Sequence, residues 1–256
     1  MGDSVTQSAQ AISFPEHMLL IGRTGSGKSS LVGEILSNID QLYHRHTKDN
    51  IVVILSPHDA VDPNFLRRFN SAQDWKIIHF TMDSLNVDSM ENVLNYLKKN
   101  KMLQKEVFLF LDDLAINGYA SKAVNSFILK AFATFRHQNI AVIATIQVGD
   151  REFKGLMENS GYVILMKHFG YHKCLEMILR TFAMTIKIPT LIRLLSPFFR
   201  SDGKIGDHIA FNFSSPAMRN EVFFLRNNIF ESGYGYTRDN IFIFSPLLCV
   251  FSTPSC

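Results

Sequence analysis

The sequence predicts an α/β sandwich in which helices cover a central, mainly parallel sheet. Several apolar runs are nearly continuous rather than alternating, which is typical of strands buried on both faces. Amphipathic helical patterns lie between these runs, and such alternation of strand and helix favours a parallel sheet. A glycine-rich segment joins the first apolar run to the first helical pattern. Together these three observations indicate one large α/β core.

The expected strands are short and strongly apolar. They lie at residues 18–21, 51–55, 77–80, 107–111, 140–146 and 162–166, and two further strands are expected near 209–213 and 222–225. The pattern changes after Pro189, so the last two strands are expected to belong to a small C-terminal appendage of the sheet.

The expected helices follow from apolar spacing. After the glycine-rich segment, apolar residues recur on one helix face from Leu31 onwards. The clearest pattern covers residues 124–135, where phenylalanine, isoleucine, valine and alanine recur at helical spacing, and we interpret this stripe as core. Further helices are expected at residues 88–99 and 172–184.

The glycine-rich segment is the strongest functional signal in the chain. Residues 22–29 read GRTGSGKS and match the P-loop pattern G-x-x-x-x-G-K-[ST] between a strand and a helix. P-loop glycines let successive backbone N–H groups point inward at a helix N-terminus, which forms an anion nest for phosphates. The expected nucleotide-binding residues are Gly22, Arg23, Thr24, Gly25, Ser26, Gly27, Lys28, Ser29 and Ser30. Lys28 would reach the β- and γ-phosphates of ATP, and the Ser29 hydroxyl would complete the coordination of Mg²⁺.

An acidic pair follows the apolar run at residues 107–111. Asp112 is the expected magnesium partner together with Ser29. Asp113 is placed to orient and partly deprotonate an attacking water, a role that needs a carboxylate within about 3 Å of that water. The alternative is that Asp113 caps the helix that follows. The pair favours a hydrolase.

A single amide ends the apolar run at residues 140–146. Gln147 would lie at the carboxyl edge of the sheet, where ligands of open α/β sheets bind, and would sense the γ-phosphate or the attacking water. The alternative is a solvated strand end. With these elements the chain resembles P-loop NTPases of the RecA/ASCE type, which implies a three-layer sandwich around a mainly parallel sheet.

The chain organisation follows from this core. Its 256 residues are 46% hydrophobic and 19% charged, as in a globular protein. The expected divisions are a polar N-terminal tail at residues 1–13, the P-loop ATPase core at 14–188, a C-terminal appendage of the core at 189–240, and an apolar tail of uncertain structure at 241–256. That tail either docks on a partner or packs back on the core as an edge.

No segment indicates a membrane. The first dozen residues lack the basic and apolar regions of a secretion signal, and no stretch approaches the roughly 18 apolar residues of a membrane span. The three cysteines include no C-x-x-C pair, which suits a reducing compartment. A soluble protein without a membrane partner is expected.

The motifs together resemble the HerA/FtsK superfamily of P-loop motor ATPases, most closely its viral genome-packaging branch in poxvirus-like and polinton-like elements. The resemblance covers roughly residues 18–180 and rests on the P-loop, the acidic pair, the Arg136–His137 step before the next strand, and Gln147. Many relatives have glutamate where Asp113 stands. The resemblance implies an ATPase that packages double-stranded DNA, works as a homo-oligomeric ring, and meets capsid vertex proteins. It also implies a place in the host cytoplasm or nucleus where virions assemble, or in the virion itself.

Ring motors commonly complete each site with an arginine from the neighbouring subunit. Arg136 is the expected catalytic arginine, and Arg180 is the second candidate. Each arginine could instead have a purely structural role. Arg136 follows a helix whose dipole it would complement. Arg180 lies four residues after Glu176, a spacing that allows an ion pair on one helix.

Residues 167–204 form a basic segment, with seven lysines and arginines against two acidic residues. Such a segment could face DNA phosphates and bind them independently of sequence. Solvated helix faces are the alternative. Charge reversal at Lys187 and Arg193 is expected to weaken DNA binding without lowering ATP affinity if the segment contacts DNA.

Other functions of P-loop proteins fit less well. A small-molecule or nucleotide kinase needs no water-activating acid and usually has an arginine-bearing lid, which is not evident. A GTPase-like switch would need N/T-K-x-D after a strand, and the TKDN at residues 47–50 lacks its aspartate in the right place. Another HerA/FtsK-type DNA translocase remains open, although such proteins commonly carry membrane anchors.

Overall fold

The computed structural model describes thirteen stretches of the chain, which between them contain one continuous sheet and its covering helices. They are residues 15–37, 50–56, 61–69, 76–81, 87–99, 106–113, 122–147, 154–166, 171–181, 189, 208–212, 222–225 and 241–244. The sheet has nine strands in the order β3-β2-β4-β5-β1-β6-β7-β8-β9. The strands are β1 (Met18–Ile21), β2 (Asn50–Ser56), β3 (Lys76–Thr81), β4 (Glu106–Leu111), β5 (Ile140–Ile146), β6 (Tyr162–Met166), β7 (His208–Asn212), β8 (Val222–Leu225) and β9 (Ile241–Phe244).

The first six strands are parallel, and β7 to β9 extend the sheet in antiparallel fashion beyond β6. The order puts β1 at the centre, between β5 and β6, and puts β5 between β1 and β4. The segments that follow β1, β4 and β5 therefore leave the sheet side by side at its carboxyl edge. These are the P-loop, the acidic pair and Gln147.

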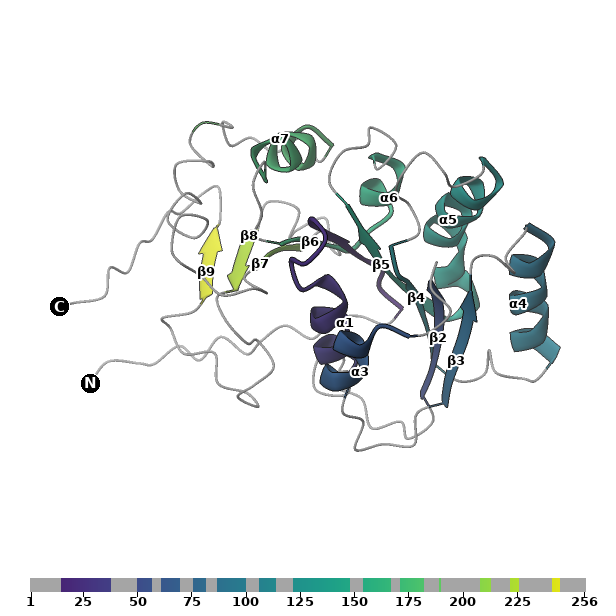
Figure 1. The fold of residues 1–256 in the computed structure, drawn as a ribbon. Coiled ribbons are helices and arrows are strands. Elements are labelled where there is room, and N and C mark those ends of the chain that lie inside the picture. Colours follow the sequence, from purple (N-terminus) through teal and green to yellow (C-terminus); the bar gives the residue numbers. More distant parts are fainter. Residues whose placement is uncertain are drawn as a thin grey trace, which may run out of the picture.

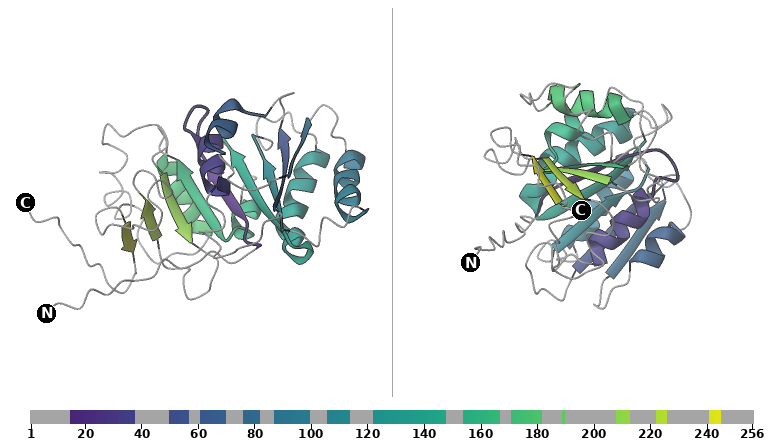
Figure 2. Two further views of the ribbon diagram at one scale, coloured as in Figure 1. Left: turned by 90° about the horizontal axis from the view of Figure 1, so that it is seen from below. Right: turned by 90° about the vertical axis from the view of Figure 1, so that its left-hand side faces the viewer.

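Helices cover both faces of the sheet, as Figures 1 and 2 show. On one face, α1 (Lys28–Ser37) and α3 (Pro63–Arg68) pack on one hydrophobic cluster. On the other face, four helices pack on a second cluster: α4 (Val87–Lys99), α5 (Lys122–Thr134), α6 (Lys154–Glu158) and α7 (Tyr171–Thr181). Successive side chains of a strand point to opposite faces, so the parallel strands supply apolar residues to both clusters. The expected three-layer α/β sandwich is confirmed.

The expected strands and helices agree closely with the structure. The strands at 18–21, 140–146, 162–166 and 222–225 have the expected bounds, and the remaining strands differ by one residue at one or both ends. The phenylalanine-rich helix ends in a 3₁₀ turn, η3 (Phe135–Gln138), which was not expected. Apart from this turn, the helical pattern of residues 124–135 packs into the core as expected.

Two short helices were missed. In α3, the Asp62 side chain accepts a hydrogen bond of 2.8 Å from the backbone N–H of Asn64, and Pro63 occupies the first turn. An aspartate followed by proline is a helix-start signal that the sequence already carried. The other missed helix, α6, has five residues, too few for a periodic apolar pattern.

The C-terminal expectations are tested only in part. The first four residues of the segment at 241–256 form β9, which pairs with β8 at the edge of the sheet. The rest of that segment, the N-terminal residues 1–14 and most of residues 182–207 lie outside the described residues. Among the described helices, none is both long and apolar enough to cross a membrane.

A buried histidine lies at the amino edge of the sheet, just before β1. His17 is fully buried, and its Nδ1 accepts a hydrogen bond of 3.1 Å from the backbone N–H of Val142. Its ring meets the Phe132 ring edge-on at a centroid distance of 5.4 Å. Burial, and secondarily the charge of Arg136, lowers the pKa of His17 to about 3. The imidazole is therefore neutral in the folded protein.

This depressed pKa predicts a loss of stability in acid. Because unfolded histidine titrates near pH 6.5, the unfolded chain takes up the proton first, and stability falls as the pH drops from 6.5 towards 3. Lowering the pH from 7.5 to 5 is expected to cost about 2 kcal/mol through His17. A His17→Asn variant keeps an acceptor for Val142 and cannot titrate, so its unfolding free energy should lack this contribution.

Denaturant unfolding of both proteins at several pH values measures the difference. The neighbouring carboxyl group of Glu16 has a pKa raised by burial, but it is present in both proteins and cancels in the comparison. Parallel pH profiles for wild type and variant would contradict the neutral buried state of His17.

Candidate functional site

The P-loop has the backbone geometry of a phosphate nest. Gly25 and Gly27 take positive φ angles of 77° and 91°, a region that favours glycine. The backbone N–H of Leu31 donates to the Gly27 carbonyl at 2.9 Å, so helix α1 starts directly from the loop. Glycine is required at position 22 on steric grounds, because a β-carbon there would lie 2.6 Å from Ser26 Oγ and 2.7 Å from Met166 Cβ. The glycines expected from the pattern are thus required by this backbone.

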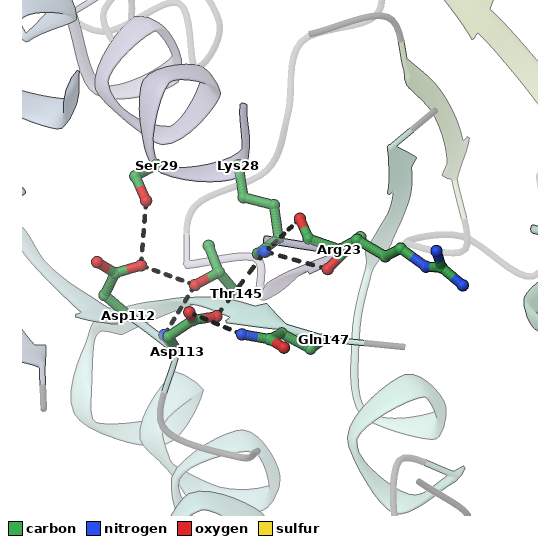
Figure 3. Close-up of polar contacts among 8 residues, drawn as sticks. Arg23, Lys28, Ser29, Asp112, Asp113, Thr145 and Gln147 are labelled. Atoms are coloured by element: carbon green, nitrogen blue, oxygen red, sulfur yellow. Dashed lines mark hydrogen bonds and ion pairs between the residues drawn. The ribbon is translucent and has the colours of Figure 1, made fainter. Parts of the chain in front are cut away.

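Lys28 lies inside the loop at the centre of the site (Figure 3). Its Nζ donates hydrogen bonds to the carbonyls of Gly22 at 3.0 Å and Arg23 at 3.1 Å, and lies 3.8 Å from Asp113 Oδ1. Burial lowers the pKa of Lys28, while the charges of Asp113 and Asp112 oppose that shift. A phosphate entering the loop would offer this ammonium stronger partners than two neutral carbonyls.

Asp112 is buried and held by two hydroxyl groups. Its Oδ1 accepts hydrogen bonds from Thr145 Oγ1 at 2.8 Å and from Ser29 Oγ at 3.3 Å. Burial raises the pKa of this carboxyl, and the Thr145 hydrogen bond opposes the shift. The structure therefore brings Ser29 and Asp112 together, as expected for the magnesium pair. A hydroxyl and a carboxylate fit Mg²⁺, which prefers oxygen ligands and takes few of them from protein.

These two residues do not form a metal cage by themselves. Within the part of the chain that the structure describes, no group of three or more histidine, cysteine, aspartate or glutamate residues could hold a metal ion.

Asp113 has an unusual backbone conformation. Its φ angle is 55°, in the left-handed region that non-glycine residues rarely adopt. In an extended strand, Asp112 and Asp113 would point to opposite faces of the sheet. Figure 3 instead shows both carboxylates turned towards the P-loop. The left-handed turn at Asp113 thus places both acids in one site.

The Asp113 side chain is held by Gln147 and faces Lys28. Gln147 Nε2 donates to Asp113 Oδ2 at 3.2 Å. Asp113 Oδ1 is buried and has no hydrogen-bond partner within the described stretches, although Lys28 Nζ lies 3.8 Å away. Asp113 Oδ1 therefore faces the Lys28 ammonium at ion-pair distance. The next described helix begins at Lys122, so the capping alternative for Asp113 does not apply to α5.

The left-handed backbone at position 113 favours aspartate over glutamate. Asparagine and aspartate are several-fold enriched among non-glycine residues with positive φ, whereas glutamate has no such preference. A shorter acid thus suits the turn at position 113, where many relatives of the resembled family have glutamate.

Thr145 was missed in the sequence. This residue is buried on β5 and contacts both members of the acidic pair, since its Oγ1 accepts a 2.9 Å hydrogen bond from the backbone N–H of Asp113. A threonine in the apolar run at residues 140–146, two residues before Gln147, was the available signal. Side chains at i and i+2 of a strand share a face.

Arg136 lies at the amino edge of the sheet, away from the P-loop of its own chain. Its Nη2 donates to the carbonyl of Asn159 at 2.7 Å and forms an ion pair of 3.2 Å with Glu16 Oε2. Arg136 therefore links the segments before β1, β5 and β6. It does not simply complement a helix dipole.

Arg180 lies in the last turn of α7 and pairs with Glu176, as the spacing predicted. Its side chain is 74% exposed. Of the basic segment at residues 167–204, the structure describes the charges at Lys173 and Arg180, both exposed, while Lys187 and Arg193 lie outside the described residues.

Comparison with known proteins gives a fold but no sequence relative. No family model and no curated protein matches the sequence. Among solved structures, the chain is similar to the genome packaging NTPase B204 from Sulfolobus turreted icosahedral virus 2 in complex with sulfate. Identity is 14%, the TM-score is 0.51, and the match covers 91% of this chain and 97% of that chain. The complex of the same protein with AMP matches with 14% identity and a TM-score of 0.48, over 77% of this chain and 92% of that chain.

A more distant match is EssC (ATPases 2 and 3) from Geobacillus thermodenitrificans. It has 11% identity and a TM-score of 0.43, and the match covers 84% of this chain and 38% of that chain. The near-complete coverage of B204 confirms the P-loop ATPase fold that the resemblance implied.

Proposed function

We propose that this chain is an ATP-hydrolysing motor that translocates double-stranded DNA into a viral capsid. The main observation that supports ATP hydrolysis is the placement of Asp113. Its left-handed backbone brings a second carboxylate to the P-loop, with Oδ1 free of hydrogen bonds and Gln147 on Oδ2. A P-loop kinase needs no such acid. The similarity of fold to a packaging NTPase supports the motor reading.

The residues suggest the following reaction. The backbone N–H groups of the P-loop and the Lys28 ammonium bind the phosphates of ATP. The oxygen of a water molecule bonds to the γ-phosphorus of ATP, and the water gives its proton to Asp113. The bond between that phosphorus and the ADP oxygen breaks, which gives ADP and inorganic phosphate. Gln147 orients Asp113 or the water. Mg²⁺, held by Ser29 and Asp112, would neutralise charge on the β- and γ-phosphates.

The partners belong to the same proposal. A homo-oligomeric ring would surround double-stranded DNA, and the basic segment at residues 167–204 would face the DNA phosphates. Capsid vertex proteins would anchor the ring where virions assemble, in the host cytoplasm or nucleus. The motor would then be found at the assembly site or in the virion.

We infer that Arg180 is the better candidate for an arginine acting on the neighbouring subunit. A finger must leave its own subunit, and the Arg180 side chain is 74% exposed with one partner on its own helix. Arg136 is 37% exposed and has two partners on other segments. Exposed ion pairs contribute about 0–1 kcal/mol, so Arg180 would leave Glu176 at little cost.

The test of the proposed function is magnesium-dependent ATP hydrolysis with and without double-stranded DNA. The wild type is expected to hydrolyse ATP faster with DNA present, and a Lys28→Met variant, which keeps the buried chain but loses the charge, is expected to be inactive. Lys154→Met, an exposed lysine on α6, serves as the matched control. Transfer of phosphate to an added small molecule, without DNA stimulation, would instead indicate a kinase.

A further inference from the structure

Thr145 makes two hydrogen bonds that join the acidic pair to the neighbouring strand. Its hydroxyl donates to Asp112 Oδ1 at 2.8 Å and accepts from the backbone N–H of Asp113 at 2.9 Å. The residue is 1% exposed and lies on β5, next to Leu20 of β1 in the sheet register. Figure 3 shows it between Asp112 and Asp113. One hydroxyl group thus contacts both acids that the proposed reaction uses.

The two hydrogen bonds fix different features. The bond to Asp112 fixes the orientation of a buried carboxylate, and hydrogen bonds to a charged group are stronger than neutral ones. The bond from the Asp113 N–H anchors the peptide group that enters the left-handed turn to β5. A non-glycine residue in that region is conformationally unfavourable, and surrounding contacts must offset this cost.

Among the residues that the structure describes, none of the neighbours makes both of these hydrogen bonds in place of Thr145. Ser29 also donates to Asp112 Oδ1, but at 3.3 Å, and the proposed function assigns the Ser29 hydroxyl to Mg²⁺. Gln147 holds the side chain of Asp113 and not its backbone. Valine would fill the space of threonine but would leave the Asp113 N–H and one Asp112 oxygen with a lost partner.

We propose that Thr145 is a positioning residue that holds Asp112 for magnesium and Asp113 in its left-handed turn for proton transfer. The inference rests on the proposed function for its catalytic consequence, but its structural part stands on the two hydrogen bonds alone. It also gives β5 a direct link to both acids, so that a movement of this strand would move them together.

The experiment compares Thr145→Val with Thr145→Ser, which keeps the hydroxyl. A matched control is Thr134→Val, which removes a threonine hydroxyl on α5 that donates to the helix carbonyl of Lys130 at 2.8 Å. Thermal melting first verifies that each variant folds. If Thr145→Val does not fold, Thr145→Cys, with a weakly hydrogen-bonding thiol, takes its place.

Three readouts are used. In nucleotide-free protein, amide exchange at Asp113 measured by NMR should be at least about tenfold faster in Thr145→Val than in wild type. The magnesium concentration that half-saturates binding of a fluorescent ATP analogue should rise about 10- to 100-fold. In hydrolysis, kcat should fall about tenfold or more while KM for ATP changes little. Thr145→Ser and Thr134→Val should stay near wild type.

The outcomes separate the inference from the proposed function. If wild type hydrolyses ATP and Thr145→Val matches it in exchange, magnesium dependence and kcat, the inference is wrong and the function stands. If wild type does not hydrolyse ATP, the proposed function fails, and the amide exchange at Asp113 still decides the structural part. A Thr145→Ser variant as impaired as Thr145→Val would also overturn the inference, because the hydroxyl would then not be the cause.

Discussion

Replacing Asp113 by asparagine is expected to lower kcat for ATP hydrolysis by about 10²- to 10⁴-fold, the usual contribution of a general base. Asparagine fits a φ angle of 55° as readily as aspartate and can accept a hydrogen bond from Gln147, so the local structure should persist. The variant loses the proton acceptor and also the negative charge beside Lys28, whose Nζ lies 3.8 Å from Asp113 Oδ1. Because the phosphates of a bound nucleotide would give Lys28 other partners, nucleotide affinity should stay within about threefold of wild type. Single-turnover hydrolysis together with nucleotide titration measures the two effects separately.

Two further variants sharpen this test. Asp113→Glu restores a carboxylate but places a longer side chain on a left-handed backbone, so partial activity is expected. Glu158→Gln removes an exposed acid that pairs with Lys154 on α6 and should behave as wild type. If Asp113→Asn hydrolysed ATP at the wild-type rate, another group would have to accept the proton.

Replacing Arg180 by alanine is expected to reduce hydrolysis by about 10³- to 10⁵-fold if this residue completes the neighbouring site, as arginine fingers do in related NTPases. Nucleotide binding and folding should survive, because the Arg180 side chain is exposed and its partner Glu176 lies on the same helix. Lys154→Ala, which removes an exposed cation on α6 outside the basic segment, is the matched control.

A mixing experiment identifies the direction of action. Arg180→Ala subunits retain their own P-loop residues, and Asp113→Asn subunits retain Arg180, so mixed rings should regain part of the activity that each variant lacks. Absence of any recovery in mixed rings would argue against action between subunits. Arg136→Ala is expected to lower stability, since it leaves the Glu16 carboxylate, whose side chain is only 12% exposed, without its cation.

The parts of the site that could be predicted from sequence are those carried by short patterns. The P-loop glycines, Lys28 and Ser29 follow one another in a fixed motif, and buried apolar runs placed Asp112 and Gln147 at strand ends. Because parallel strands end at one edge of the sheet, assigning these residues to strand ends was enough to place them at the same edge. The strand order that puts β5 between β1 and β4 was not read from the sequence.

The remaining features depend on contacts between distant segments. The left-handed turn at Asp113 is held by a threonine 32 residues away, and no local pattern announces it. Arg136 was interpreted from its position near a helix end, whereas its contacts with Glu16 and Asn159 come from the packing of three segments. Such roles are fixed by tertiary structure, so a single sequence gives their residue types without their partners.

The most direct test of the account is whether the chain moves along DNA at the expense of ATP. A third strand annealed to one end of a linear duplex reports translocation when it is displaced. We expect wild type to displace it with ATP and Mg²⁺, and neither Asp113→Asn nor a non-hydrolysable ATP analogue to support displacement. ATP hydrolysis stimulated by DNA but without displacement, or equal displacement by Asp113→Asn, would contradict a motor driven by this site.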